Sequence, residues 1–231
     1  MGIPVEVLDI LKGIYDKCAD GPECPCKMPF DPKEGLVPRG VTGAWTGNPD
    51  DVKLVVVGMN PGRPVKYEEE EYSKIWDGDP HDRSSNLAQK TAEVAMTLYL
   101  GRELRKDEGP RPYHRTLMEK VLAPALGYSA VETKMLNEVY FTELMKCSTK
   151  DRKKPLLVEH RCNVHKCGKY LRKELEIFNN AKAILALGRD VDAALLVVTD
   201  KPVVWCPHPS RPKNSYPEVV KQLKDALGGM S

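Results

Sequence analysis

Four short apolar segments constrain the fold of this chain more than any other feature. They are "VKLVVVG" (52–58), "EVYFTEL" (138–144), "AKAILALG" (181–188) and "KPVVWC" (201–206). Such runs of β-branched and apolar residues are typical of parallel strands that are covered on both faces. Segments with helical periodicity lie between and after them, at residues 87–101, 115–126, 156–178, 189–197 and 216–227. This alternation predicts a three-layer α/β/α fold around a central, mostly parallel four-stranded sheet.

The length of 231 residues, of which 41% are hydrophobic, suits one domain that spans residues 1–231. Residues 3–17 have the apolar spacing of an amphipathic helix, and we expect this helix and the rest of residues 1–50 to pack on the domain. Residues 19–51 contain too many Gly, Pro and Asp residues for regular structure. The acidic residues at 68–71 and 77–82 predict a solvated, mobile insertion.

The net charge of +2 gives the chain no strong overall field, so an anion-binding surface has to come from a local cluster. No stretch of eighteen apolar residues occurs, and charged residues interrupt the apolar positions near the N-terminus. We therefore expect a monomer that is cytoplasmic (nucleoid-associated) or nuclear.

The seven cysteines are many for such a protein, and their odd number argues against a closed disulfide framework. They form two groups and one outlier, which favours a metal or cluster site that the fold closes. The groups are Cys18, Cys24 and Cys26, then Cys147, Cys162 and Cys167, with Cys206 apart.

Ligands of parallel α/β sheets bind outside the carboxyl ends of the strands, which here places residues 58–64, 146–154 and 206–212 on one edge. Asn60 follows a predicted buried strand and is held by Pro61 and Gly62. Its amide can position a water molecule, or it can simply form an Asx turn. His208 follows the last predicted strand, where a neutral imidazole can donate to a developing anion.

"GMNPGRP" (58–64) and "HPSRP" (208–212) together resemble motifs A and B of the uracil-DNA glycosylase superfamily. The segments "VYFTELMKC" (139–147), "CGKYLRKEL" (167–175) and "AILALGRD" (183–190) resemble those of its iron–sulfur branch, family 4. The Met-Asn-Pro-Gly form of motif A is instead similar to the single-strand-selective and mismatch-specific branches. The resemblance implies a monofunctional DNA repair enzyme that flips a deaminated base, uracil first, and hydrolyses its glycosidic bond to leave an abasic site.

The resemblance also implies roles for individual residues. Asn60 would orient the attacking water, and His208 would stabilise the base anion. "GPRPYHRTL" (109–117) resembles a family segment in which an aromatic residue stacks on the base, which assigns stacking to Tyr113, with Tyr67 as its competitor. Further residues are expected to line the base pocket, namely Gly58, Met59, Pro61, Gly62 and Ser210, and Arg211 would enter the duplex.

Glu143 stands where family 4 has the asparagine that reads the uracil edge. An ionised carboxylate accepts from N3–H but repels the O4 acceptor of uracil. Hypoxanthine, xanthine or a cytosine-like base is therefore an alternative substrate, and a non-catalytic damage-binding module is another. A third interpretation pairs Glu143 with Lys146 or another cation outside the pocket.

Family 4 members hold a [4Fe–4S] cluster with four cysteines, and the matching positions here imply Cys18, Cys24, Cys147 and Cys167. Cys26 and Cys162 are reserves, because the spacing departs from the family's. Zinc bound by His160, Cys162, His165 and Cys167 is the rival, although four ligands so close on one helix converge poorly on a tetrahedral ion. Cys206 is expected to be a buried apolar thiol.

A basic segment, "KCSTKDRKKP" (146–155), is predicted at the same edge. Such clusters neutralise DNA phosphates, although a merely solvated loop has the same composition. The residues expected to contact DNA are Arg63, Lys146, Lys150, Arg152, Lys153, Lys154 and Arg211.

Overall fold

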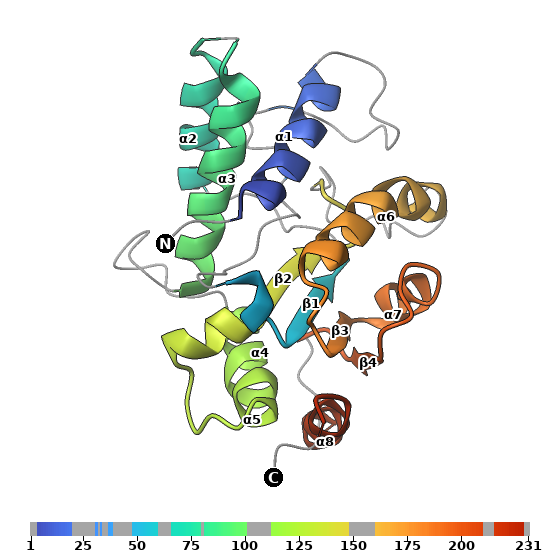
Figure 1. The fold of residues 1–231 in the computed structure, drawn as a ribbon. Helices are drawn as coiled ribbons and strands as arrows, with labels where there is room; N and C mark the ends of the chain where they lie inside the picture. The colour runs from blue at the N-terminus through green and yellow to red at the C-terminus, as the bar shows by residue number, and fades with distance from the viewer. Residues whose placement is uncertain are drawn as a thin grey trace.

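The computed structural model describes residues 4–19, 31, 33, 37–38, 48–59, 66–79, 81–100, 112–147, 160–209 and 215–228. Its centre is a sheet of four strands in the order β2-β1-β3-β4, and all neighbouring strands are parallel. The predicted three-layer fold with a parallel sheet is thereby confirmed (Figure 1). The strands are β1 (Leu54–Gly58), β2 (Val139–Glu143), β3 (Ala183–Leu187) and β4 (Val203–Cys206).

Helices precede, connect and follow the strands. Between β1 and β2 the chain forms several of them, including a π-helical segment η3 (Met118–Leu122) that joins α4 to α5. The 3₁₀ helix η2 (Pro49–Asp51) precedes β1, and the 3₁₀ helix η4 (Thr133–Glu138) precedes β2. The α-helices are α1 (Val5–Ala19), α2 (Lys66–Trp76), α3 (Arg83–Leu100), α4 (Pro112–Leu117), α5 (Ala123–Ala125), α6 (His160–Ile177), α7 (Arg189–Leu195) and α8 (Tyr216–Ala226).

The two central strands, β1 and β3, are apolar and buried throughout because both faces of the sheet are covered. Side chains alternate between faces along a strand. Val55 and Val57 face a core shared with α1, α6 and α7, whereas Leu54 and Val56 face a core shared with α4, η3 and α8. In Figure 1, α1 and α6 accordingly lie on one side of the strands, and α4, α5 and α8 lie on the other.

The acidic segment at residues 68–71 is part of a helix, so the prediction of a solvated, mobile insertion is wrong there, whereas the described residues of 77–82 are exposed as predicted. Residues 66–76 form α2, which packs against α3. Tyr72 is fully buried, and even Glu68 is only 1% exposed. The apolar residues Tyr72, Ile75 and Trp76 recur at helical spacing and contact the core. The four glutamates before them dominate the composition of the segment, and the helical pattern was therefore overlooked.

Buried hydroxyl groups join the three N-terminal helices. The Tyr15 hydroxyl lies 2.7 Å from Thr91 Oγ1, and Thr91 donates to the Tyr72 hydroxyl at 3.3 Å. Tyr15 also donates to the main-chain oxygen of Pro38 at 2.5 Å. Pro38 in turn forms an isolated antiparallel bridge with Cys147, just beyond β2. The N-terminal helices are therefore tied to the segment that leaves the carboxyl end of β2.

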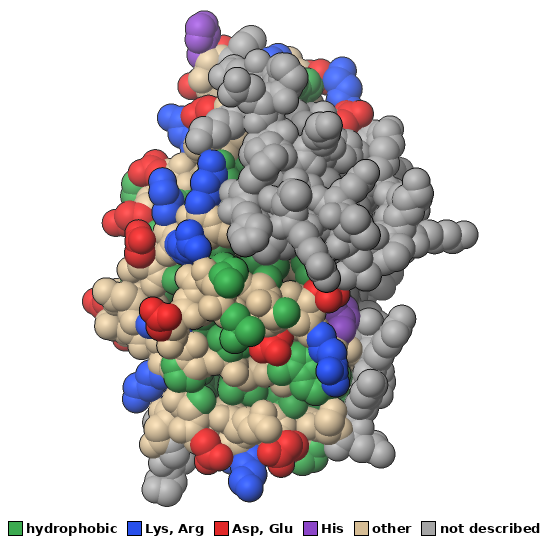
Figure 2. Space-filling view, turned by 90° about the vertical axis from the view of Figure 1, so that its right-hand side faces the viewer, with side chains coloured by type: hydrophobic (Ala, Val, Ile, Leu, Met, Phe, Trp, Pro, Cys, Tyr) green, Lys and Arg blue, Asp and Glu red, His purple; other side chains and the backbone are tan. Residues whose placement is uncertain are grey.

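Figure 2 shows the face that carries α6, α7 and α8, where apolar side chains gather among charged ones. Leu196 and Val197, in the turn after α7, are 74% and 57% exposed. Among the described residues, no helix has the length and hydropathy required to cross a membrane.

Candidate active site

The strand order places a topological switch point at the carboxyl end of β1. From β1 the chain passes to β2 on one side of it and then to β3 and β4 on the other. In such sheets, loops that leave neighbouring strand ends in opposite directions open a crevice between them, which is the usual ligand site. The segments in which the sequence predicted chemistry begin at this edge, at Met59, Leu144 and Pro207.

The loop after β1 runs beside the segment after β2. Leu144 N–H donates to the oxygen of Gly58, and Met145 N–H donates to the oxygen of Met59, both at 2.8 Å. The parallel pairing thus continues past the formal end of the strands. It fixes the start of the loop that carries Asn60 relative to Glu143, the last residue of β2.

The loop after β4 is anchored on the other side of the crevice. Gly188 N–H donates to the oxygen of Cys206 at 2.8 Å, and the Cys206 thiol donates to the oxygen of Pro207 at 3.3 Å. Burial raises the pKa of Cys206 to about 12, so the thiol stays protonated and keeps this bond, as expected of an apolar thiol. Pro207 and Pro209 are buried, whereas His208 between them is exposed.

The strand order fixes the spacing of the two strand ends. β4 is the second strand from β1, with β3 between them. Neighbouring strands lie about 4.8 Å apart, so the backbones of β1 and β4 are about 10 Å apart.

A buried polar network lies beneath this edge. The Lys146 ammonium is 2.5 Å from Glu174 Oε1 on α6 and donates to Thr142 Oγ1 at 3.0 Å and to the main-chain oxygen of Glu143 at 2.6 Å. Glu174 also accepts from Thr142 and, at 3.1 Å, from the Tyr140 hydroxyl. Burial raises the pKa of Glu174, and the Lys146 charge opposes that rise.

One sequence-based interpretation of Lys146 is wrong. Lys146 is only 1% exposed and therefore cannot neutralise a DNA phosphate. Its partners include Glu174, Thr142 and the main-chain oxygen of Glu143, and the pairing of the Glu143 carboxylate with a cation stays a prediction.

The sequence analysis missed Glu174, although the helix pattern carries a signal for it. Glu174 lies on the stripe that Leu171, Leu175 and Phe178 form at helical spacing, and all four are buried. A carboxylate on the apolar stripe of a helix requires a buried partner. Lys146, which follows the predicted strand 138–144, is the cation that pairs with Glu174 in the structure.

Two of the four cysteines assigned to a cluster are buried thiols. Cys147 follows β2, and Cys167 lies in α6, which packs against α1. Cys18 lies in the last turn of α1. The cluster assignment stays a prediction; among the residues that the structure describes, no three His, Cys, Asp or Glu side chains gather as metal ligands would. Cys24, Cys26 and the side chains of Cys18 and Cys162 lie outside the described residues.

The four members of the rival zinc set all lie within α6. Cys167 is buried. The side chains of His160, Cys162 and His165 lie outside the described residues, so the zinc set stays a prediction.

Several predicted site residues cannot be placed. The structure describes Gly58, Met59, Glu143 and His208 at one edge of the sheet and the backbone of Tyr113 in α4. The remaining predictions lie outside the described residues: Asn60, Pro61, Gly62, Arg63, Lys150, Arg152, Lys153, Lys154, Ser210, Arg211, and the side chains of Tyr67 and Tyr113.

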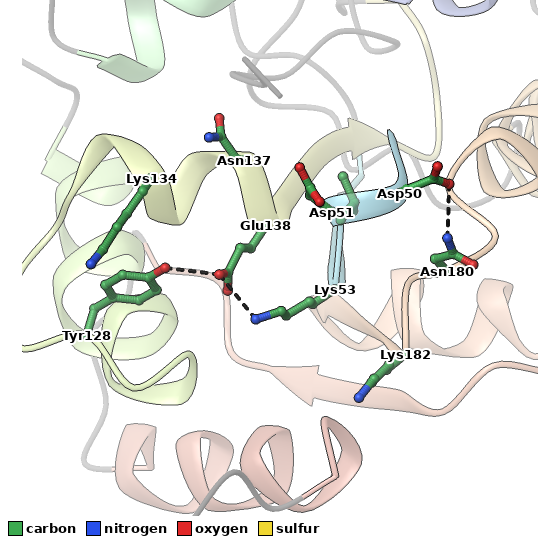
Figure 3. Close-up of a pocket in the computed structure, with 10 residues that line it drawn as sticks. Asp50, Asp51, Lys53, Tyr128, Lys134, Asn137, Glu138, Asn180 and Lys182 are labelled. Atoms are coloured by element: carbon green, nitrogen blue, oxygen red, sulfur yellow. Dashed lines mark hydrogen bonds and ion pairs between the residues drawn. The ribbon is translucent and has the colours of Figure 1, made fainter. Parts of the chain in front are cut away.

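A cavity of about 660 Å³ opens at the opposite, amino-terminal edge of the sheet (Figure 3). Glu138 Oε1 accepts from the Tyr128 hydroxyl at 3.0 Å and lies 3.1 Å from Lys53 Nζ, and Asn180 donates to Asp50 at 3.0 Å. Carboxylates and ammonium groups of similar number line this cavity, so it presents no single charge to a ligand. It is also remote from the strand ends on which the predicted site residues lie.

The Tyr128 hydroxyl in the wall of this cavity makes the stability of the protein depend on pH. Burial and the bond to Glu138 raise the pKa of Tyr128 from 10.0 to about 12. Between these values the unfolded chain loses the proton while the folded chain keeps it, so the free energy of unfolding falls as pH rises. We expect the stability advantage of the wild type over Tyr128→Phe to shrink across this range. Urea unfolding of both chains below pH 10 and near 12 measures it, and an unchanged difference would contradict the assignment.

Comparison with known proteins identifies the family of the chain. The family model described as the uracil DNA glycosylase superfamily matches residues 44–225, which include all four strands and the loops at their carboxyl ends. A search of curated proteins gives no match.

Proposed function

Since the chain belongs to the uracil DNA glycosylase superfamily, we propose that it is a monofunctional DNA glycosylase that removes a damaged base, uracil included, and leaves an abasic site. The observation that carries the proposal is that three segments leave the same, carboxyl edge of the parallel sheet. They begin at Met59, at Leu144 and at Pro207. The family match covers all three.

The reaction needs a flipped nucleotide, a water and a stabilised leaving group. Asn60 would orient the water toward C1′ of the sugar, and the C1′–N bond would break with its electron pair on the base. His208 would donate a hydrogen bond to the developing base anion. Its exposed position after β4 suits a group that must contact an incoming base.

No described lysine at this edge suits Schiff-base chemistry. A lysine nucleophile has to be neutral and accessible. The Lys146 ammonium is buried and bonded to Glu174, Thr142 and the Glu143 main chain. The proposed product is therefore an intact abasic strand, without cleavage by a lyase step.

We also propose that Cys18, Cys24, Cys147 and Cys167 hold a [4Fe–4S] cluster. The burial of Cys147 and Cys167 supports this assignment, because burial shields thiolates and cluster from solvent. Such a cluster would pin the N-terminal helix to the segment after β2, a structural contribution. Within this pair, Cys147→Ser and Cys167→Ser should each lower bound iron and sulfide, whereas Cys206→Ser should not.

The decisive experiment incubates the purified protein with oligonucleotides that contain uracil, hypoxanthine, xanthine or a thymine mispair, single- and double-stranded. We expect free base and strands that break only after alkali treatment. Binding to damaged DNA without an abasic product would overturn the glycosylase proposal in favour of a binding module. Strand cleavage without alkali would overturn its monofunctional part.

A further inference from the structure

Glu143 extends its carboxylate over the last residue of β1. Glu143 and Gly58 are direct partners in the β1–β2 register. Glu143 Oε2 lies 2.0 Å from the point that a Cβ on residue 58 would occupy, which is far closer than any two such atoms approach. Only glycine leaves this space, so the carboxylate reaches across the strand end toward the loop that begins at Met59.

The backbone of Glu143 is fixed from two sides. Lys146 donates to its main-chain oxygen at 2.6 Å, and the next residue, Leu144, donates to the oxygen of Gly58 at 2.8 Å. Lys146 uses its other donors on Thr142 and Glu174. The carboxylate therefore stands on a strand end whose backbone is fixed. Its side chain is half-buried, and Oε2 is buried against Gly58.

A carboxylate in this position can only accept hydrogen bonds when it is ionised. Uracil and hypoxanthine present one ring N–H beside a carbonyl oxygen, so one contact is favourable and the other is repulsive. A base that carries an amino group beside a ring N–H presents two donors, which match the two carboxylate oxygens. Guanine-type lesions such as 8-oxoguanine have this edge.

We propose that Glu143 determines base specificity and selects damaged bases with two adjacent donors over uracil and hypoxanthine. The inference rests on the proposed glycosylase function and names the substrate class of that same site. Undamaged guanine shares the edge, so the lesion itself has to supply the remaining selectivity by easing extrusion from the duplex or cleavage of the glycosidic bond.

The test compares kcat/KM on oligonucleotides that contain 8-oxoguanine, hypoxanthine or uracil. A matched pair of hydrogen bonds discriminates bases by about 10- to 100-fold. We expect the wild type to favour 8-oxoguanine over hypoxanthine by that factor. Glu143→Gln should reverse the preference, because an amide offers one acceptor and one donor and so matches the uracil and hypoxanthine edge.

Two further variants separate specificity from folding. Glu143→Asp keeps the charge and should keep the preference at a lower rate. Glu138→Gln, at the other end of β2, should leave the ratio unchanged. If the wild type favours hypoxanthine or uracil, or if Glu143→Gln leaves the ratio unchanged, the inference is overturned while the glycosylase proposal stands. If no base is released from any oligonucleotide, the proposed function itself fails.

Discussion

Replacing Lys146 by methionine should destabilise the protein by about 3–5 kcal/mol, the largest stability effect that we expect from a single side chain. The substitution leaves the fully buried Glu174 carboxylate without the ammonium that lies 2.5 Å away. The two hydroxyl donors that remain, from Thr142 and Tyr140, cannot compensate for a buried negative charge. Urea unfolding near pH 7 measures the loss as a lower midpoint with an unchanged slope.

Two variants control for the loss of a lysine as such. Lys74 pairs with Glu71 at 2.7 Å on the surface of α2, and Lys74→Met should cost less than about 1 kcal/mol. The double variant Lys146→Met/Glu174→Leu removes both buried charges and should be more stable than Lys146→Met alone. If Lys146→Met costs no more than Lys74→Met, the buried pair does not have the role that its geometry assigns to it.

Replacing His208 by alanine should lower kcat for base release by on the order of 10²-fold or more, because one preorganised donor to the leaving group is lost. The fold should not change, since His208 is exposed. Asn60→Ala should have an effect of similar size through loss of the oriented water. Single-turnover cleavage of the best oligonucleotide substrate separates the chemical step from product release.

Matched controls for both variants lie elsewhere on the surface. His81 is exposed between α2 and α3, and Asn180 is exposed at the amino-terminal edge of the sheet. His81→Ala and Asn180→Ala should retain wild-type rates. Wild-type cleavage by His208→Ala and Asn60→Ala on every base tested would show that other groups perform the chemistry.

The strands were predictable from the sequence because burial on both faces leaves an unbroken apolar run, which few other structures produce. Their predicted bounds differ from those of β1–β4 by at most two residues, and the predicted C-terminal ends of β1 and β4 match. The edge that carries the site was also predictable, since parallel strands all end on the same side. Met59, Glu143 and His208 lie on that edge.

Other features depend on contacts that a sequence pattern does not contain. The helix α2 was hidden because charge dominates its composition, while its burial comes from packing against α3. The pairing of Lys146 with Glu174 joins residues from different elements, so neither position reveals its partner. The contact between Gly58 and Glu143 depends likewise on strand register, which is set by the whole sheet.

The close fit of Glu143 over Gly58 couples the two positions during evolution. Alanine at position 58 while Glu143 is present places its methyl group where the carboxylate lies, so that step displaces the flexible end of the Glu143 side chain and not the backbone. A shorter residue at position 143 leaves the space free, and alanine at 58 then displaces nothing. The two sites are thus epistatic, since a change at position 58 moves the carboxylate only while Glu143 is present.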